Sequence, residues 1–241
     1  MNADALATTL VCAPGLMCDA TVWQAQIAAF ESQLPIQVID YGSLDSLPAM
    51  AAHLLQQAPP KFALAGHSMG GRVALEVMRL APERVTHLAL LDTGCHALPT
   101  GEAAAKERTM RLGFLSLAQD KGVAAMARSW VRNMVHPDRL ADAPLINSIV
   151  TMFARKPVEI YAAQIKALLA RPEAFPLLAQ IRCPALVLCG NEDANSPPVA
   201  NREMAEAIPG AQLEIIPQCG HMSLQERPDV VNAALKALLA R

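Results

Sequence analysis

Short runs of apolar residues alternate with longer, amphipathic stretches along most of this chain. Such runs, separated by helical patterns, are typical of strands that are buried on both faces of a parallel sheet. We therefore expect an α/β architecture with a mostly parallel, six-stranded sheet flanked by helices. The predicted strands are Leu10–Cys12, Ile36–Ile39, Phe62–Ala65, Leu88–Leu91, Leu186–Leu188 and Leu213–Ile216.

The alternation stops between Leu91 and Ala185, and from about residue 101 to 171 no strand pattern occurs. Helical patterns follow one another instead. The clearest begins after Pro157, where Val158, Tyr161, Ile165 and Leu168 repeat at one-face helical spacing. The other helical patterns are 102–119, 123–135 and 145–154. We expect residues 97–175 to form a helical insertion between two parts of one core, residues 1–96 and 176–241.

Composition and charge narrow the functional classes. A chain of 241 residues with 53% hydrophobic residues can bury one large core. Its formal net charge is −2 and no basic tract occurs, so we expect no nucleic-acid or membrane partner. Residues 1–5 lack the charged start of a signal peptide, and the six cysteines show no C-x-x-C pair. These features predict a cytoplasmic protein with reduced thiols.

The most informative chemical motif is Gly66-His67-Ser68-Met69-Gly70-Gly71. It follows a predicted strand and precedes a helical pattern, which is the setting in which G-x-S-x-G forms a nucleophile elbow. The serine must lie on a strained turn, and a side chain at Gly66 or Gly70 would collide with the returning helix. Gly71 would let that helix begin close to the strand. Ser68 is therefore the candidate nucleophile.

Two further candidates follow later strands. Asp193 lies in the loop after Ala185–Cys189, and His221 follows the strand 213–216. Because parallel strands bring their carboxyl ends to one edge of the sheet, both side chains should meet Ser68 there. Asp92, after the strand Leu88–Leu91, and Glu192 compete with Asp193 for the role of the acid.

The chain order Ser68, Asp193, His221 resembles that of the α/β-hydrolase superfamily, from about Thr8 to the C-terminus. The resemblance favours Asp193 as the acid, because Gly190-x-x-Asp193 before Pro197-Pro198 is similar to the family's pattern. It implies that the helical insertion is a cap over the site. Full-length members usually begin with two extra strands, and the few residues before Leu10 leave little room for them.

The same resemblance implies an oxyanion hole made of two backbone N–H groups. One maps to Met69, directly after the candidate nucleophile, and the other to Leu16. Pro14-Gly15 stands here where relatives commonly have His-Gly, so Met17 is the alternative second donor.

The cap is expected to supply a largely hydrophobic substrate pocket. Trp130, Phe153 and Met126 are its candidate pocket residues, although such side chains can equally hold cap helices together. Arg72 is a further candidate, since Gly70-Gly71-Arg72 is similar to the elbow of the menaquinone-pathway synthase of this superfamily, in which the arginine helps bind a carboxylate. It could also be a surface residue of its helix.

These residue types predict a serine hydrolase that cleaves a small or medium-chain carboxylic ester, a small-molecule substrate, through an acyl-enzyme. Cleavage of a C–C, lactone or thioester bond, a lyase reaction like that of the synthase, and ligand sensing by a protein that retains the triad stay open. No metal-binding motif or phosphate-binding glycine loop occurs, so we expect neither metal nor cofactor. A homodimer is possible through exposed cap surface.

Overall fold

The computed structural model describes residues 8–241, so the expectation about a signal peptide at residues 1–5 lies outside the described part. Six strands form one sheet in the order β2-β1-β3-β4-β5-β6, and all five neighbouring pairs are parallel. The predicted six-stranded sheet is therefore confirmed. The strands are β1 (Leu10–Ala13), β2 (Ile36–Val38), β3 (Phe62–His67), β4 (Val85–Leu91), β5 (Ala185–Gly190) and β6 (Gln212–Ile216).

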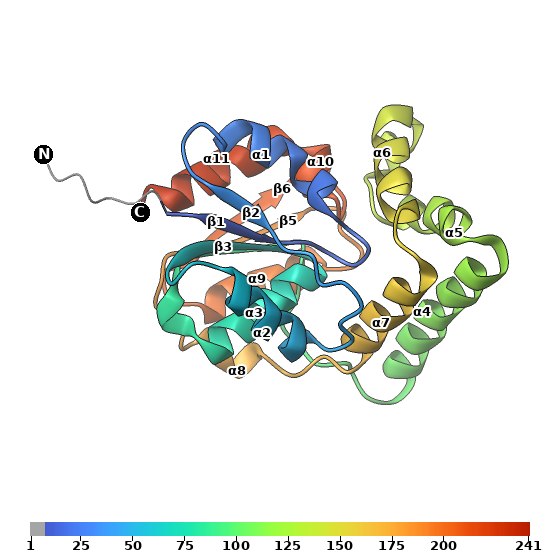
Figure 1. Ribbon diagram of the computed structural model, residues 1–241, viewed down its shortest axis with the longest axis horizontal. Coiled ribbons are helices and arrows are strands. Elements are labelled where there is room, and N and C mark those ends of the chain that lie inside the picture. The colour runs from blue at the N-terminus through green and yellow to red at the C-terminus, as the bar shows by residue number, and fades with distance from the viewer. Residues whose placement is uncertain (1–7) are drawn as a thin grey trace, which may run out of the picture.

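Helices cover both faces of this sheet (Figure 1). One face carries α1 (Gln24–Phe30), α10 (Ser223–Glu226) and α11 (Pro228–Leu239). The other carries α2 (Leu47–Gln57), α3 (Met69–Leu80), α8 (Phe175–Leu178) and α9 (Pro198–Ala207). Every residue of β1, β3 and β5 is buried, because these strands lie between the two helical layers. This double covering explains why the strands are continuous apolar runs.

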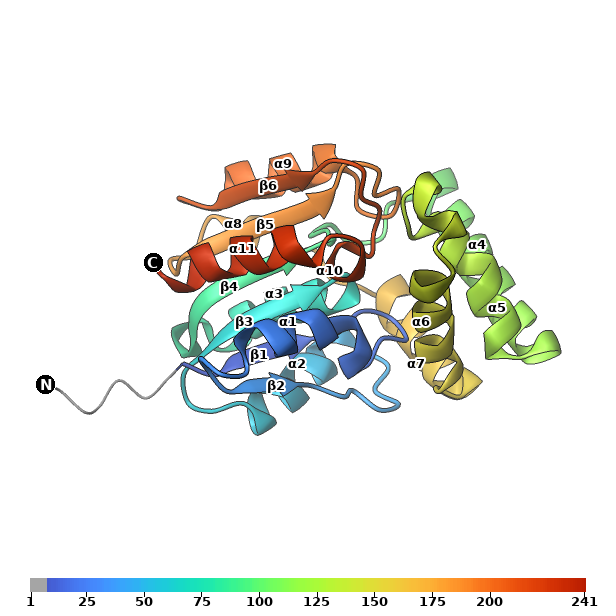
Figure 2. The same cartoon turned by 90° about the horizontal axis from the view of Figure 1, so that it is seen from above.

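The segment between β4 and β5 is helical and contains no strand, and the structure describes all of it. Its main helices are α4 (Gly101–Lys121), α5 (Val123–Trp130), α6 (Ala143–Ala154) and α7 (Val158–Leu169). The pattern over 123–135 predicted one helix, whereas α5 ends at Trp130 and a 3₁₀ turn, Val131–Asn133, follows. Figure 2 shows these helices beyond the carboxyl ends of the strands. Among residues 8–241, no helix is both long and apolar enough to cross a membrane.

Three glycines allow the chain to pack tightly around Ser68. A Cβ atom on Gly66 would overlap the Gly70 carbonyl at the start of α3, as expected from the motif. A Cβ atom on Gly70 would instead overlap the Ala13 carbonyl at the end of β1, a contact between segments far apart in sequence. On Gly71 it would come within 2.5 Å of Thr93 Cγ2. The turn at Ser68 is therefore packed against the chain that follows β1 and β4, as well as against its own helix, α3.

We expect Gly70→Ala to lower the free energy of unfolding by about 3 kcal/mol or more, because the obstructing atoms are backbone and cannot move aside. Gly113→Ala is the matched control. Gly113 is exposed within α4 and has open space around it, so alanine there should raise stability by about 0.5–1 kcal/mol. Urea denaturation of both variants measures the difference. Similar unfolding midpoints for the two would contradict the packing account.

Candidate active site

Ser68 lies on the turn between β3 and α3 in a strained backbone conformation. Its φ is +54°, a region that residues other than glycine rarely adopt. The Ser68 N–H donates to the Leu91 carbonyl at 2.9 Å, and the Thr93 hydroxyl donates to the Ser68 carbonyl at 2.7 Å. These bonds from the end of β4 hold the strained turn. The chain thus turns sharply at Ser68, between the end of β3 and the start of α3.

The three side chains predicted to act together form one hydrogen-bonded chain. His221 Nε2 lies 2.8 Å from Ser68 Oγ, and His221 Nδ1 lies 2.8 Å from Asp193 Oδ2. An ionised carboxylate only accepts hydrogen bonds, so Nδ1 donates to Asp193 and Nε2 accepts from the serine hydroxyl. Asp193 and His221 are both buried. This arrangement can remove the proton from Ser68 when the serine attacks.

Local hydrogen bonds keep Asp193 ionised. Burial opposes its charge, but His221 and the N–H groups of Ser196 and Asn195, at 2.9 and 2.8 Å from Oδ1, hold the pKa of Asp193 below its ordinary value. Burial likewise opposes protonation of His221, and the facing Asp193 carboxylate outweighs it, so that the pKa of His221 is raised above 6.5. The ionised Asp193 carboxylate thus stabilises the imidazolium form of His221. That form must arise whenever His221 acts as a general base.

The two competing acids do not contact the His221 ring. Asp92 is fully buried, accepts hydrogen bonds from the Ser223 hydroxyl and the Gly190 N–H, and has a pKa raised well above its ordinary value by burial and by the charge of Asp193. Glu192 accepts the Cys219 N–H at 3.0 Å. Both side chains brace the loops that carry the site, and Asp193 alone of the three bonds to the imidazole.

His67, directly before the nucleophile, is also in contact with His221. Its Nε2 lies 3.0 Å from the His221 carbonyl, and the two rings lie 5.4 Å apart between centroids. Burial and the neighbouring His221 lower the pKa of His67 to about 3, so its ring is neutral at pH 7. The His67 side chain therefore ties the elbow to the histidine loop rather than titrating with it.

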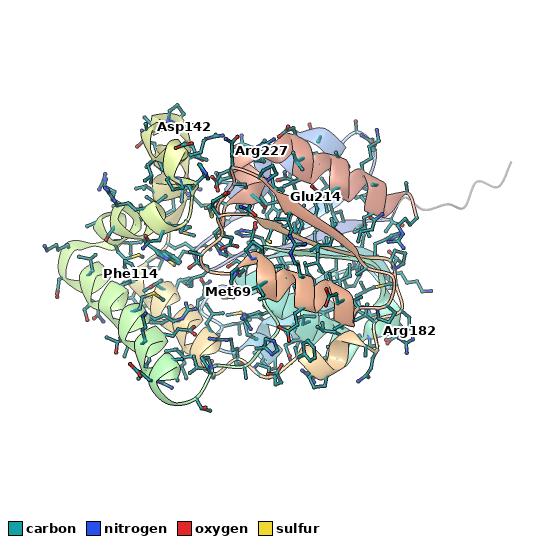
Figure 3. The ribbon with its side chains drawn as sticks, turned by 180° about the vertical axis from the view of Figure 1, so that it is seen from behind. Met69, Phe114, Asp142, Arg182, Glu214 and Arg227 are labelled. Atoms are coloured by element: carbon teal, nitrogen blue, oxygen red, sulfur yellow. The ribbon has the colours of Figure 1, made fainter. Side chains whose placement is uncertain are left out.

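Two backbone N–H groups beside Ser68 remain without protein acceptors in the described part of the chain. Met69 begins α3, where the first N–H groups of a helix have no intrahelical partner, and Leu16 lies in the loop after β1. Both residues line the cavity at Ser68. Figure 3 shows Met69 at the start of α3, on the side that faces the α4–α7 segment. The Met17 N–H, considered as an alternative donor, instead bonds Gln164 Oε1 at 2.8 Å.

The cavity at Ser68 is bordered by the sheet edge and by the helical segment. Among the predicted pocket residues, Trp130 and Arg72 line it. Met126 and Phe153 do not, and both are fully buried. Phe153 lies behind Trp130 with ring centroids 5.2 Å apart, so it supports the pocket wall from the hydrophobic core of the segment. The apolar character of Trp130 and Phe153 alone could not show which side chain lines the cavity and which packs behind it.

Sequence reasoning missed two side chains. Gln164 lies on the buried face of α7 between Tyr161 and Leu168, and a polar residue in an apolar stripe was the signal that could have identified it. Arg111, on α4, lines the cavity opposite the elbow. No sequence pattern marked Arg111, because α4 is largely exposed and polar on most sides. Within residues 8–241, no cluster of three or more potential metal ligands occurs.

Proteins similar to this chain include esterases. The model of the alpha/beta hydrolase family matches residues 10–234. The chain is 25% identical over 242 residues to the pimeloyl-[acyl-carrier protein] methyl ester esterase of Nitrosomonas europaea, and the match covers 90% of each. It is 28% identical over 181 residues to BpoC of Mycobacterium tuberculosis, a protein named for non-heme bromoperoxidase activity. That match covers 73% of this chain and 66%, less than two thirds, of BpoC.

Among solved structures, a thermophilic esterase from Thermogutta terrifontis with malate bound is similar over nearly the whole chain. The TM-score is 0.82 at 28% identity, and the match covers 97% of this chain and 89% of that one.

Proposed function

The chain belongs to the alpha/beta hydrolase family, and we propose that it is a serine hydrolase that cleaves a small or medium-chain carboxylic ester through an acyl-enzyme on Ser68. The observation that carries this proposal is the chain of 2.8 Å hydrogen bonds from Ser68 through His221 to Asp193, at the wall of a cavity. The likeness to esterases supports the same bond type.

In the proposed acylation step, Ser68 Oγ attacks the ester carbonyl while His221 Nε2 takes the hydroxyl proton. Asp193 holds the imidazole in the tautomer that accepts at Nε2 and stabilises the imidazolium that forms. The N–H groups of Met69 and Leu16 would bind the negative oxygen of the tetrahedral intermediate, and each such donor contributes roughly 3 kcal/mol. The intermediate then expels the alcohol, which receives the proton from His221.

Deacylation repeats these roles with water in place of the serine. His221 removes a proton from the attacking water, the Ser68–acyl bond breaks, and the proton passes to Ser68 Oγ as the carboxylic acid product leaves. The step consumes one water and restores the resting hydrogen bonds. Every proton transfer in the cycle thus uses His221 Nε2.

We further propose that residues 97–175 act as a cap that shapes the substrate pocket. Arg111, Trp130, Met134 and Leu168 of this segment line the cavity together with Ser68. The Met134 carbonyl accepts the N–H groups of His221 and Met222 at 2.7 and 3.1 Å. The segment is thereby tied to the loop that carries the base.

Shortening the cap wall should change acyl-chain preference. Because Trp130 lines the cavity, Trp130→Leu should raise kcat/KM for longer acyl chains relative to shorter ones by about fivefold to tenfold. Phe114→Leu is the matched control, since Phe114 packs 6.1 Å from the Trp130 ring, between centroids, and does not line the cavity. The measurement is a series of 4-nitrophenyl esters from acetate to decanoate. An unchanged preference in Trp130→Leu would contradict the pocket assignment.

The same ester series, measured with wild-type protein, tests the proposed function directly. Multiple turnovers within seconds on acetate to octanoate esters are expected. A lactone, a thioester and a C–C substrate in the same panel decide between bond types. Elimination from the substrate of the menaquinone-pathway synthase would indicate a lyase instead. Slow single turnover with a large rise in thermal stability would indicate a ligand sensor.

A further inference from the structure

The loop after β1 makes a strained turn at the wall of the cavity. The Cys18 N–H donates to the Gly15 carbonyl at 3.1 Å, which closes a four-residue turn with Leu16 and Met17 at its centre. Among these four residues Met17 alone has a positive φ, at +62°. This is the pattern of a type II turn, whose third residue is usually glycine because other residues are strained there. A methionine at this position therefore needs further contacts to hold it.

Gln164, on α7 of the helical segment, supplies such a contact. Its side chain is 1% exposed, and its Oε1 accepts the Met17 N–H at 2.8 Å. Since a backbone N–H can only donate, the amide must present its oxygen to the turn. The adjacent side chains on the buried face of α7, Tyr161, Ile165 and Leu168, are mostly apolar. In such surroundings the Met17 N–H would be costly to leave unpaired.

The peptide group between Leu16 and Met17 is held at both of its polar ends. Gln164 accepts its N–H, and Cys18 Sγ donates to its carbonyl at 3.6 Å. Rotation of this peptide by about 180° would convert the turn to type I and return the φ of Met17 to an unstrained, negative value. The same rotation would break both hydrogen bonds. The bond to Gln164 therefore opposes the relaxation that the local strain favours.

We propose that Gln164 is a positioning residue that fixes the proposed oxyanion hole from the helical segment. This inference rests on the proposed serine hydrolase function. The Leu16 N–H belongs to the same turn, and Leu16 lines the cavity with Met69 and Ser68. By holding the strained turn, Gln164 keeps this N–H in place before charge develops on the substrate oxygen. Oxyanion stabilisation depends on such prior placement, so a small displacement of the donor is costly.

Gln164→Leu removes the acceptor and tests the proposal. We expect it to lower kcat for 4-nitrophenyl butyrate about tenfold to 100-fold, because the Leu16 donor would be displaced rather than removed. KM should change by less than about threefold, since the lining of the cavity is unaltered. Gln164→Met retains the length of the side chain, and its thioether is only a weak acceptor. It should show the same split between kcat and KM, and it decides the question if Gln164→Leu does not fold.

Two ketones separate oxyanion binding from ordinary binding. Trifluoromethyl pentyl ketone should add to Ser68: the bond from Oγ to the carbonyl carbon forms, the serine proton passes to His221, and the ketone oxygen becomes an oxyanion. Methyl pentyl ketone has the same chain and keeps its carbonyl. In Gln164→Leu we expect the inhibition constant of the fluorinated ketone to rise by about the factor by which kcat falls. The inhibition constant of the other ketone should stay near the wild-type value.

Arg155→Met is the matched control. Arg155 also joins the helical segment to the loop after β1, through an exposed ion pair with Asp19 at 2.7 Å and a hydrogen bond to Thr21. It makes no hydrogen bond to the turn at Leu16 and Met17. Its loss should leave kcat and both inhibition constants at the wild-type values.

The outcomes distinguish this inference from the proposed function. Wild-type kcat and wild-type affinity for the fluorinated ketone in folded Gln164 variants would overturn the positioning role and leave the serine hydrolase intact. Equal weakening of both ketones, or the same losses in Arg155→Met, would indicate general loosening of the helical segment and would also overturn it. Failure of the wild-type protein to hydrolyse any ester or to label with a fluorophosphonate would overturn the proposed function and this inference with it.

Discussion

Ser68→Ala should lower kcat/KM for every ester that the protein hydrolyses by about 10⁴- to 10⁶-fold. Without the hydroxyl there is no atom to form the acyl-enzyme, and the rest of the site can only assist direct attack by water. The strained turn should persist, because it is held by backbone contacts to Leu91 and by Thr93. We therefore expect thermal stability close to that of the wild type and a large loss confined to chemistry.

A fluorophosphonate probe gives a second, independent measurement. It should add one label to the wild-type protein, in the peptide that contains Ser68, and none to Ser68→Ala. Ser196→Ala is the matched control, because Ser196 lines the same cavity but its hydroxyl makes no hydrogen bond to His221. Undiminished labelling of Ser68→Ala, or equal loss of activity in the two variants, would refute the nucleophile assignment.

Asp193→Asn should lower kcat about 10⁴-fold. An amide can donate to the imidazole and so favours the wrong tautomer, and it lacks the charge that stabilises the imidazolium. Asp92→Asn is the informative comparison, because Asp92 is buried with a pKa raised well above its ordinary value by burial, and it bonds Ser223 rather than His221. Its loss should cost far less in rate and should appear mainly as lower thermal stability. If Asp92→Asn lowered kcat severely while Asp193→Asn left it nearly unchanged, Asp92 and not Asp193 would be the acid.

The pH profile of the same variants gives a signature that misfolding would not produce. His221 must be neutral to accept the serine proton, so activity should fall as pH drops through its pKa, which Asp193 raises above 6.5. In Asp193→Asn the raising charge is gone and burial remains, so the pKa of His221 should fall. The acidic limb of the residual activity should then move to lower pH. An unmoved limb would show that Asp193 does not control the protonation of His221.

Much of the architecture could be read from local pattern. Strands between two helical layers must be apolar throughout, and Leu64, Leu90 and Val187 belong to runs with that property. The carboxyl ends of parallel strands lie at one edge of the sheet. Ser68, Asp193 and His221 each follow such an end, so they could be expected to meet although they are up to 153 residues apart. The G-x-S-x-G motif added the elbow because few residues besides glycine fit beside a tight strand–helix turn.

Other features depended on how distant segments pack. That Gly70 faces the Ala13 carbonyl, rather than only its own helix, follows from the neighbouring position of β1 and β3. That Trp130 lines the cavity while Phe153 lies behind it depends on the rotation of α5 and α6 against one another. Both side chains are large and apolar, and the hydrophobic effect that buries them has no direction.

The sequence by itself determined the order of elements, the parallel sheet and the three polar side chains at its carboxyl edge. These features depend on apolar periodicity and on turn residues, which reflect interactions between residues close together in the chain. Only the tertiary structure decided which acid reaches His221, which N–H of the Leu16–Met17 loop stays free, and which arginines share the cavity. These depend on angstrom-scale distances between segments such as α3, α4 and α7. Electrostatic and hydrogen-bond energies change steeply over such distances, whereas sequence spacing does not record them.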